Sequence, residues 1–382
     1  MVIKLLKKSS KYILGLSGGP DSVFLFNYLL DNGFKNFVVC HVNYNFRKDS
    51  NQDLELVKKM CKKYEIEYFI KNIKQDYNNL KENFESWART IRYDFFCEQF
   101  EKQKADAILI AHNLNDHIET YLMQKNNKKK VRYFGINSES YYKNKKILRP
   151  ILSIKKSDII KDLDEKNIGY IIDSTNSDLK YERNKLRFTL RENTFNKLIK
   201  EIDIKNEKIL NYKLKIEDLI YSNVLNIDKF NDDNEWNEYL LFSFLERNQF
   251  SYFLYKTKKA IIREFLKQIL SKKKLVEIKK GNLILMKDYE LIRVVNSEEL
   301  DTFEIENSND KFFKKLLIEN NIVNHENIVV TNNWKKYQSK LLVNDKFLSK
   351  IYRDKKINYL KRYKNILIFD KTKKILLNKI NI

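Results

Sequence analysis

The sequence contains few of the residues that carry redox or metal chemistry. Its 382 residues include three cysteines and four histidines, and no two cysteines form a CxxC pair. A disulfide framework and a cysteine-based zinc site are therefore excluded. His112 and His117 lie five positions apart, which is poor spacing for two metal ligands on one helix.

Long hydrophobic runs are also missing. No run of eighteen apolar residues occurs, and residues 1–12 are too charged for a signal peptide. Hydrophobic residues nevertheless make up 43% of the chain, enough for two or three domains with cores of their own. We therefore expect a soluble, cytoplasmic protein that does not span a membrane.

Glycine and proline are scarce, at seven and two residues, whereas basic residues are abundant. The 74 Lys and Arg exceed the 51 Asp and Glu, which gives a net charge of +23. An AT-rich genome also produces an excess of lysine. The high net charge is therefore explained either by genome composition or by a polyanionic partner. Surface lysines attract phosphates in either case.

Residues 1–200 alternate short apolar runs with helical patterns, which predicts an α/β domain with a doubly wound parallel sheet. We predict helices near 20–32, 50–63, 80–104, 114–124 and 155–167. The predicted strands are Tyr12–Leu16, Phe37–Val42, Tyr68–Ile73, Ala107–Ala111, Ile147–Leu148 and Tyr170–Ile172. Ligands of such domains bind where strands end and helices begin.

The rest of the chain has a different character. Residues 201–300 predict a mainly helical domain, with helix over 205–270 and a short β pair, Leu283–Met286 and Leu291–Val295. Residues 296–310 are acidic and polar and predict a linker. Residues 310–382 predict a small basic α+β domain whose strands are Ile328–Thr331, Asn365–Phe369 and Ile375–Leu377.

The strongest motif is the loop that follows the first predicted strand, Ser17-Gly18-Gly19-Pro20-Asp21-Ser22. Adjacent glycines let a backbone come close to a ligand, and the N–H groups of the following helix turn attract an anion. The two serine hydroxyls can donate to phosphate. Asp21 repels phosphate, but its carboxylate can hold a Mg²⁺ ion that bridges phosphates.

This loop resembles the SGGxDS loop of the ATP pyrophosphatase superfamily, whose members cleave ATP between the α and β phosphates and adenylate a substrate. No GxxxxGK[ST] or GxGxxG motif occurs in the chain, which disfavours a Walker-type enzyme and a dinucleotide-binding fold.

Further segments are similar to the tRNA(Ile)-lysidine synthetase family. They are 85–93 (ESWARTIRY), 111–120 (AHNLNDHIET), 149–152 (RPIL), 173–178 (DSTNSD), 183–187 (RNKLR) and, near the end, 346–362. The resemblance implies a ligase that uses ATP and Mg²⁺ to attach L-lysine to C2 of the wobble cytidine of the CAU anticodon in tRNA(Ile). An adenylated tRNA would be the intermediate, and AMP and pyrophosphate the by-products.

The resemblance also implies roles for individual residues. Asp116 and Glu119 would recognise the substrate lysine, although acids in a first helix turn also stabilise the helix dipole. His112 would contact nucleotide or transfer a proton, with a structural histidine as the alternative. Arg89 and Arg92 would hold phosphate or pair with the acids, or form solvated salt bridges.

The resemblance implies that the domains predicted over 201–300 and 310–382 both bind tRNA, and the remaining basic residues are predicted to contact it. Arg183 and Arg187 would contact tRNA phosphates, with a surface ion pair as the alternative. The C-terminal cluster expected to contact tRNA consists of Lys346, Lys350, Arg353, Lys355, Lys356, Lys361 and Arg362.

The chain departs from the family in two places. The usual HVDHGLR is His41-Val42-Asn43-Tyr44-Asn45-Phe46-Arg47 here, and an Arg-Gly-rich loop is replaced by the basic run 125–132. Two rival functions are also considered, a tRNA sulfurtransferase with the same loop and a non-catalytic basic RNA-binding protein whose loop is vestigial. A sulfurtransferase needs reactive cysteines, whereas Cys40, Cys61 and Cys97 have the pattern of small core residues.

Overall fold

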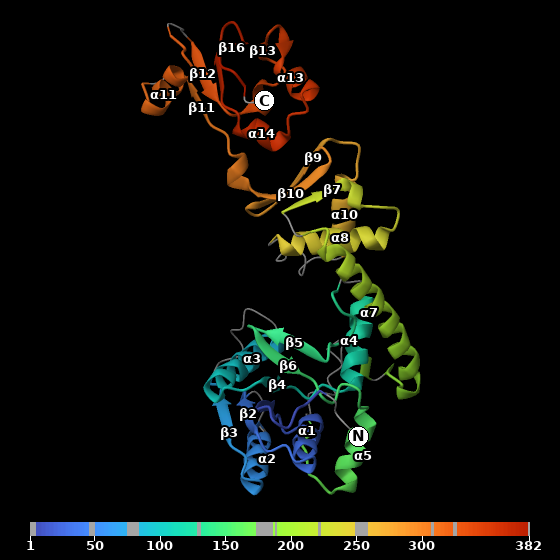
Figure 1. Ribbon diagram of the computed structural model, residues 1–382. Coiled ribbons are helices and arrows are strands. Elements are labelled where there is room, and N and C mark those ends of the chain that lie inside the picture. The colour runs from blue at the N-terminus through green and yellow to red at the C-terminus, as the bar shows by residue number, and fades with distance from the viewer. Residues whose placement is uncertain are drawn as a thin grey trace. The chain divides into compact units, whose positions relative to one another are not determined.

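The computed structural model describes residues 5–45, 50–74, 84–127, 131–172, 186–187, 189–220, 223–248, 259–306, 309–323 and 327–380 (Figure 1). The chain forms two compact units, Met1–Ile209 and Leu210–Ile382, and each is described by itself. Within the described ranges, no helix has both the length and the apolar character needed to cross a bilayer.

The first unit is built on a six-stranded sheet with the order β3-β2-β1-β4-β6-β5. All neighbouring pairs are parallel except β5 and β6, which are antiparallel. The strands are β1 (Tyr12–Gly15), β2 (Phe37–Asn43), β3 (Tyr68–Asn72), β4 (Ala107–Leu109), β5 (Glu139–Tyr142) and β6 (Lys145–Leu148). The predicted doubly wound α/β fold is confirmed.

Helices cover both faces of this sheet (Figure 1). They are α1 (Pro20–Asp31), α2 (Ser50–Lys63), α3 (Phe84–Gln103), α4 (Leu114–Asn126) and α5 (Lys156–Glu165). Side chains alternate along a strand, so Leu14 of β1 packs into the core of α1, α2 and α5, whereas Ile13 packs into the core of α3. Both side chains are fully buried.

A long helix, α7 (Phe195–Glu217), follows a short 3-10 helix, η3 (Glu192–Thr194). Its first turns pack against α4, because Phe195 and Ile202 share a buried cluster with Ile118 and Tyr121. The start of α7 is thereby attached to the helix that follows β4.

The second unit contains two sheets. The first has the order β7-β10-β9-β8, is antiparallel throughout, and is accompanied by two helices. Its elements are β7 (Val224–Asn226), α8 (Asn234–Arg247), α10 (Lys259–Ile269), β8 (Leu275–Lys280), β9 (Leu283–Asp288) and β10 (Leu291–Asn296).

The last sheet has the order β11-β12-β15-β16-β13-β14. Its strands are β11 (Glu304–Glu306), β12 (Ile328–Thr331), β13 (Leu342–Val343), β14 (Lys346–Phe347), β15 (Leu367–Asp370) and β16 (Ile375–Leu376). Its helices are α11 (Lys311–Glu319), α12 (Trp334–Tyr337), α13 (Leu348–Asp354) and α14 (Tyr359–Lys364).

Three predicted elements are wrong in ways that matter below. Tyr170–Ile172 is not a strand: Ile171 N–H donates to the Gly18 carbonyl at 3.0 Å, and the run lies against the loop instead of pairing in the sheet. Within the predicted helix 205–270, Val224–Asn226 is an edge strand paired with β10. The predicted linker 296–310 contains β11, because its Ile305 pairs with β12.

Candidate active site

The phosphate loop leaves the carboxyl end of β1 and enters α1. Gly18 has φ +91°, a backbone conformation that favours glycine, and a Cβ there would lie 3.3 Å from Asp53 Oδ1. Gly19 is the N-cap of α1 and Pro20 is its first residue. Proline fits this position because it lacks the N–H that would otherwise go unbonded.

The serine hydroxyls hold the loop in shape. Ser17 N–H donates to Ser22 Oγ at 3.1 Å, and Ser22 Oγ–H donates to the Gly19 carbonyl at 2.9 Å. The first-turn N–H groups of a helix have no acceptor within the helix, and the helix dipole adds partial positive charge there. The loop therefore presents an anion-binding surface at the start of α1.

A buried histidine supports the loop from β2. His41 Nδ1 lies 2.8 Å from the Leu16 carbonyl oxygen, and burial lowers the pKa of His41 below its ordinary value. The ring is therefore neutral near pH 7, and because a carbonyl can only accept, Nδ1 carries the proton. This histidine is one of the residues retained in the divergent 41–47 segment, and it fixes the residue that precedes Ser17.

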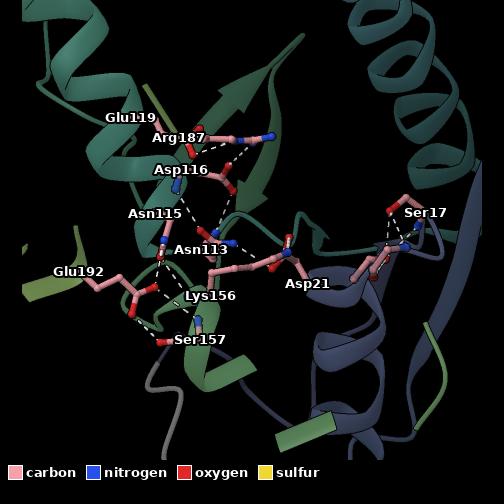
Figure 2. Close-up of polar contacts among 12 residues, drawn as sticks. Ser17, Asp21, Asn113, Asn115, Asp116, Glu119, Lys156, Ser157, Arg187 and Glu192 are labelled. Atoms are coloured by element: carbon pink, nitrogen blue, oxygen red, sulfur yellow. Dashed lines mark hydrogen bonds and ion pairs between the residues drawn. The ribbon is translucent and has the colours of Figure 1, made fainter. Parts of the chain in front are cut away.

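The helix that follows β4 begins next to this loop. β1 and β4 are neighbours, and the chain winds away from them in opposite directions, which is where doubly wound folds bind ligands. Asn113 caps α4 and forms a capping box with Asp116. Its side-chain amide also donates to Asp21 Oδ1 at 2.8 Å (Figure 2). The phosphate loop and the first turn of α4 are thus directly joined.

Arg187 is a cationic neighbour of both acids on α4. Arg187 Nε donates to Glu119 Oε1 at 2.8 Å, and Arg187 Nη2 lies 3.6 Å from Asp116 Oδ1 (Figure 2). The Glu119 side chain is 3% exposed and that of Asp116 13%. A buried carboxylate requires a compensating positive charge, so this pair forms a place where a cation binds.

His112, at the end of β4, is oriented by an arginine. Arg149 is buried, and its Nε donates to His112 Nδ1 at 3.0 Å. A second Arg149 nitrogen, Nη1, donates to the Asn137 carbonyl and to Ser140 Oγ. Because a guanidinium only donates, His112 Nδ1 accepts, and the neutral ring carries its proton on Nε2. His112 can therefore act as a hydrogen-bond donor in this arrangement.

A lysine that the sequence did not single out also reaches the loop. Lys156, the first residue of α5, places Nζ 2.6 Å from Asp21 Oδ2 (Figure 2). Its backbone N–H donates to Asn115 Oδ1 at 2.9 Å. Glu192 accepts hydrogen bonds from Asn115 and from Ser157, so α4, α5 and η3 are joined at one point beside the loop.

Sequence similarity identifies the family of this chain. Residues 2–194 match the PP-loop domain family. The chain is 38% identical to tRNA(Ile)-lysidine synthase of Mycoplasma mycoides subsp. mycoides SC, and the alignment covers 98% of each protein. This chain belongs to the tRNA(Ile)-lysidine synthase family. It is also 38% identical to the Mesoplasma florum enzyme of that name over 97% of this chain and 98% of the relative. The Ureaplasma parvum enzyme is 32% identical over 79% of this chain and 92% of the relative.

The two arginines predicted to hold phosphate or pair with the acids, Arg89 and Arg92, both lie on α3. Arg89 is exposed and its Cζ lies 4.4 Å from the centroid of the Tyr93 ring, while Arg92 Cζ lies 5.8 Å from the same ring. The buried Arg92 Nε has no hydrogen-bond partner among the described residues. Arg183 and the segment 173–178 lie outside the described residues.

The fit to a metal ion rests on Asp21. In the described part of the chain, no group of three His, Cys, Asp or Glu side chains could hold a metal. Mg²⁺ commonly uses one or two carboxylates and takes its other ligands from substrate phosphates and water. Asp21 supplies one carboxylate beside an anion-binding loop, which fits this mode.

The cysteines of this family member are free and buried. Burial raises the pKa of Cys61 to about 12 and also raises those of Cys40 and Cys97. The thiolate is the reactive form of cysteine, so none of the three is prepared for sulfur transfer, as expected for small core residues.

Proposed function

We propose that this protein attaches L-lysine to C2 of the wobble cytidine in the CAU anticodon of tRNA(Ile), with conversion of ATP to AMP and pyrophosphate. Two relatives that align with almost the whole chain are named tRNA(Ile)-lysidine synthase. One observation carries the proposal: the 2.8 Å hydrogen bond from Asn113 to Asp21 joins an anion-binding loop to a carboxylate pair that binds a cation.

ATP would bind at the loop. Backbone N–H groups at the start of α1 and the hydroxyls of Ser17 and Ser22 would hold its phosphates. Asp21 would hold Mg²⁺, which supplies charge neutralisation at the phosphates when bound. His112, whose proton lies on Nε2, would donate a hydrogen bond to nucleotide rather than accept a proton.

The substrate lysine would bind beside ATP. Asp116 and Glu119 accept the Arg187 guanidinium in the structure, and an ε-ammonium carries the same charge. Arg187 would move aside when lysine enters, and could then meet a tRNA phosphate, as expected from the sequence. Both carboxylates would orient the amine for attack.

Adenylation of the tRNA would precede attachment of lysine. The C2 oxygen of cytidine attacks the α-phosphorus, the bond to the β-phosphate oxygen breaks, and pyrophosphate leaves with the electron pair. The lysine ε-ammonium then loses one proton to water, and the neutral amine attacks C2. A C–N bond forms, the C2–O bond breaks, and AMP leaves. Adenylation is required because an unmodified oxygen is a poor leaving group.

The tRNA would bind to exposed basic residues, among them the C-terminal cluster on β14, α13, α14 and the turn between the two helices. Lys346, Lys350, Arg353, Lys355, Lys356 and Lys361 are all exposed. Arg362 is different: it is 4% exposed and surrounded by aromatic rings. Its predicted contact with tRNA is wrong, because the side chain is part of the core.

The assay is incorporation of radiolabelled lysine into a transcript with a CAU anticodon, in the presence of ATP and Mg²⁺. We expect lysine-dependent AMP release and labelled RNA. A transcript with a CAG anticodon provides the control and should remain unlabelled. Transfer of sulfur instead of lysine would support the sulfurtransferase, and tRNA binding without AMP release would support the non-catalytic protein.

A further inference from the structure

The phosphate loop brings no positive side chain of its own. Residues 17–22 contain two serines, two glycines, a proline and an aspartate, so loop and ligand are both anionic at this point. Backbone N–H groups offer only partial charges. Pyrophosphate gains negative charge as it leaves, and a cationic side chain close by would stabilise it in addition to a bound Mg²⁺ ion.

Lys156 is placed to supply that charge. It lies 135 residues from Asp21 in the sequence, yet its Nζ is 2.6 Å from Asp21 Oδ2, inside the loop. Its backbone is fixed, because Asn115 Oδ1 accepts the Lys156 N–H at 2.9 Å and α5 packs against α1 through the shared core. Only the flexible side chain has to move to pass from the carboxylate to a phosphate in the same loop.

We propose that Lys156 is a catalytic residue that binds the β- and γ-phosphates of ATP and stabilises the departing pyrophosphate. The proposal rests on the proposed function only for its second half, since phosphate binding can be measured without tRNA or lysine. During adenylation the ammonium donates hydrogen bonds to pyrophosphate oxygens and transfers no proton. The bond between the α-phosphorus and the bridging oxygen breaks, and the electron pair stays on pyrophosphate.

A purely structural role explains the position of Lys156 less well. Asp21 already accepts a hydrogen bond from Asn113 and lies in the first turn of α1, where the helix dipole favours a carboxylate. The Lys156 and Asp21 side chains are 31% and 25% exposed, so water still reaches the pair and reduces its contribution to stability. Asp21 thus does not need a lysine in order to fold, whereas a triphosphate carries more negative charge than one Mg²⁺ ion on Asp21 neutralises.

Three ligands that differ in their phosphates test this role. Affinities of ATP, inorganic pyrophosphate and AMP are measured by calorimetry for the full chain and for Lys156→Met. Loss of a charged hydrogen bond should lower the affinities of ATP and pyrophosphate by about 10- to 100-fold. The affinity of AMP should change by less than about twofold. Lys161→Met is the matched control, since Lys161 lies exposed on the same helix and should leave all three affinities unchanged.

A conservative variant guards against a folding artefact. Lys156→Arg keeps the charge and should recover most of the ATP affinity, and its melting temperature should match that of Lys156→Met. Equal losses for ATP and AMP, or unchanged ATP affinity in Lys156→Met, would overturn the proposal. If the wild-type chain binds ATP in this way but attaches no lysine, the proposed function fails and the phosphate-binding role of Lys156 stands.

Discussion

Charged side chains serve different purposes in two regions of the molecule, the phosphate loop of the first unit and the surroundings of Arg362 in the second. In the first, the charged pairs around the loop are open at one end: Lys156 is 31% exposed beside Asp21, and Arg187 is 35% exposed beside Glu119. In the second, Arg362 is enclosed, with Cζ 3.9 Å from the Tyr359 ring centroid and hydrogen bonds to the Ile357 carbonyl and the Tyr289 hydroxyl. A cation that faces a carboxylate can be exchanged for a ligand, whereas one held by rings and carbonyls only packs.

The second unit also uses a buried acid for packing. Asp288, at the end of β9, is 1% exposed and accepts the Tyr359 N–H at 2.8 Å and the Leu360 N–H at 3.2 Å. It therefore caps α14 from the neighbouring sheet. Tyr359 and Leu360 also pack on the cluster formed by Ile284, Met286 and Val295. Removal of the chain beyond residue 310 would expose this cluster, so charge variants test the C-terminal surface better than truncation does.

The largest expected effect is at Asp21. Asp21→Asn keeps the shape of the loop but removes the anionic ligand for Mg²⁺. The transition state should lose several kcal/mol of stabilisation, so the turnover rate should fall about 100-fold or more. The partly exposed ion pair with Lys156 contributes at most about 1 kcal/mol to stability. Steady-state AMP formation and thermal melting measure the two effects separately. Activity within about threefold of wild type would remove Asp21 from the metal site.

The reverse pattern is expected at Arg362. Arg362→Met removes a buried cation together with its hydrogen bonds and ring contacts, and should destabilise the second unit by about 2–4 kcal/mol. Lys361→Met, at the exposed neighbouring position, should leave the denaturation midpoint unchanged. Chemical denaturation of both variants measures the difference. Equal midpoints would show that Arg362 does not stabilise the fold, and a fall in tRNA affinity without destabilisation would return it to the RNA surface.

Glu119 separates lysine binding from ATP binding. Glu119→Gln preserves size but removes a buried charge that would meet the ε-ammonium, so the KM for lysine should rise by about 10-fold or more. The KM for ATP should change by less than about twofold. Glu201→Gln is the control, because Glu201 also forms ion pairs, with Lys125 of α4 and with Lys205 of its own helix α7, and has no assigned role in the site. Equal rises in both KM values would make Glu119 a structural residue.

The sequence predicts the loop well and its surroundings less completely. The loop is a continuous string whose glycines and proline specify the backbone, and Asp116 and Glu119 share a helix face because of their spacing. Lys156 has no such local pattern in a lysine-rich chain, and only the packing of α5 on α1 brings it to Asp21. Arg362 also has no local pattern that distinguishes it from a surface cation. Its burial depends on the rings of Trp334 in α12 and Tyr352 in α13, which are distant in sequence or separated by a turn.

The smallest effect concerns the tRNA surface. With roughly five phosphate contacts, log affinity for tRNA against log salt should have a slope of about −3 to −4. Replacing Lys346, Lys350 and Arg353 with Gln should flatten this slope by about 1 for each cation that pairs with a phosphate. The control replaces three exposed lysines of α11, Lys311, Lys314 and Lys315. Equal flattening by both variants would show that net charge, and not this cluster, attracts tRNA.

If the loop binds ATP and the acid pair on α4 binds lysine, an adenylated RNA should form before lysine reacts. ATP labelled at the α-phosphate is incubated with a CAU transcript and no lysine, and the RNA is then isolated. We predict labelled RNA from the wild type and from Glu119→Gln, none from Asp21→Asn, and rapid release of the label as AMP when lysine is added to the wild type only. Label that appears on lysine and never on RNA would contradict this order of events.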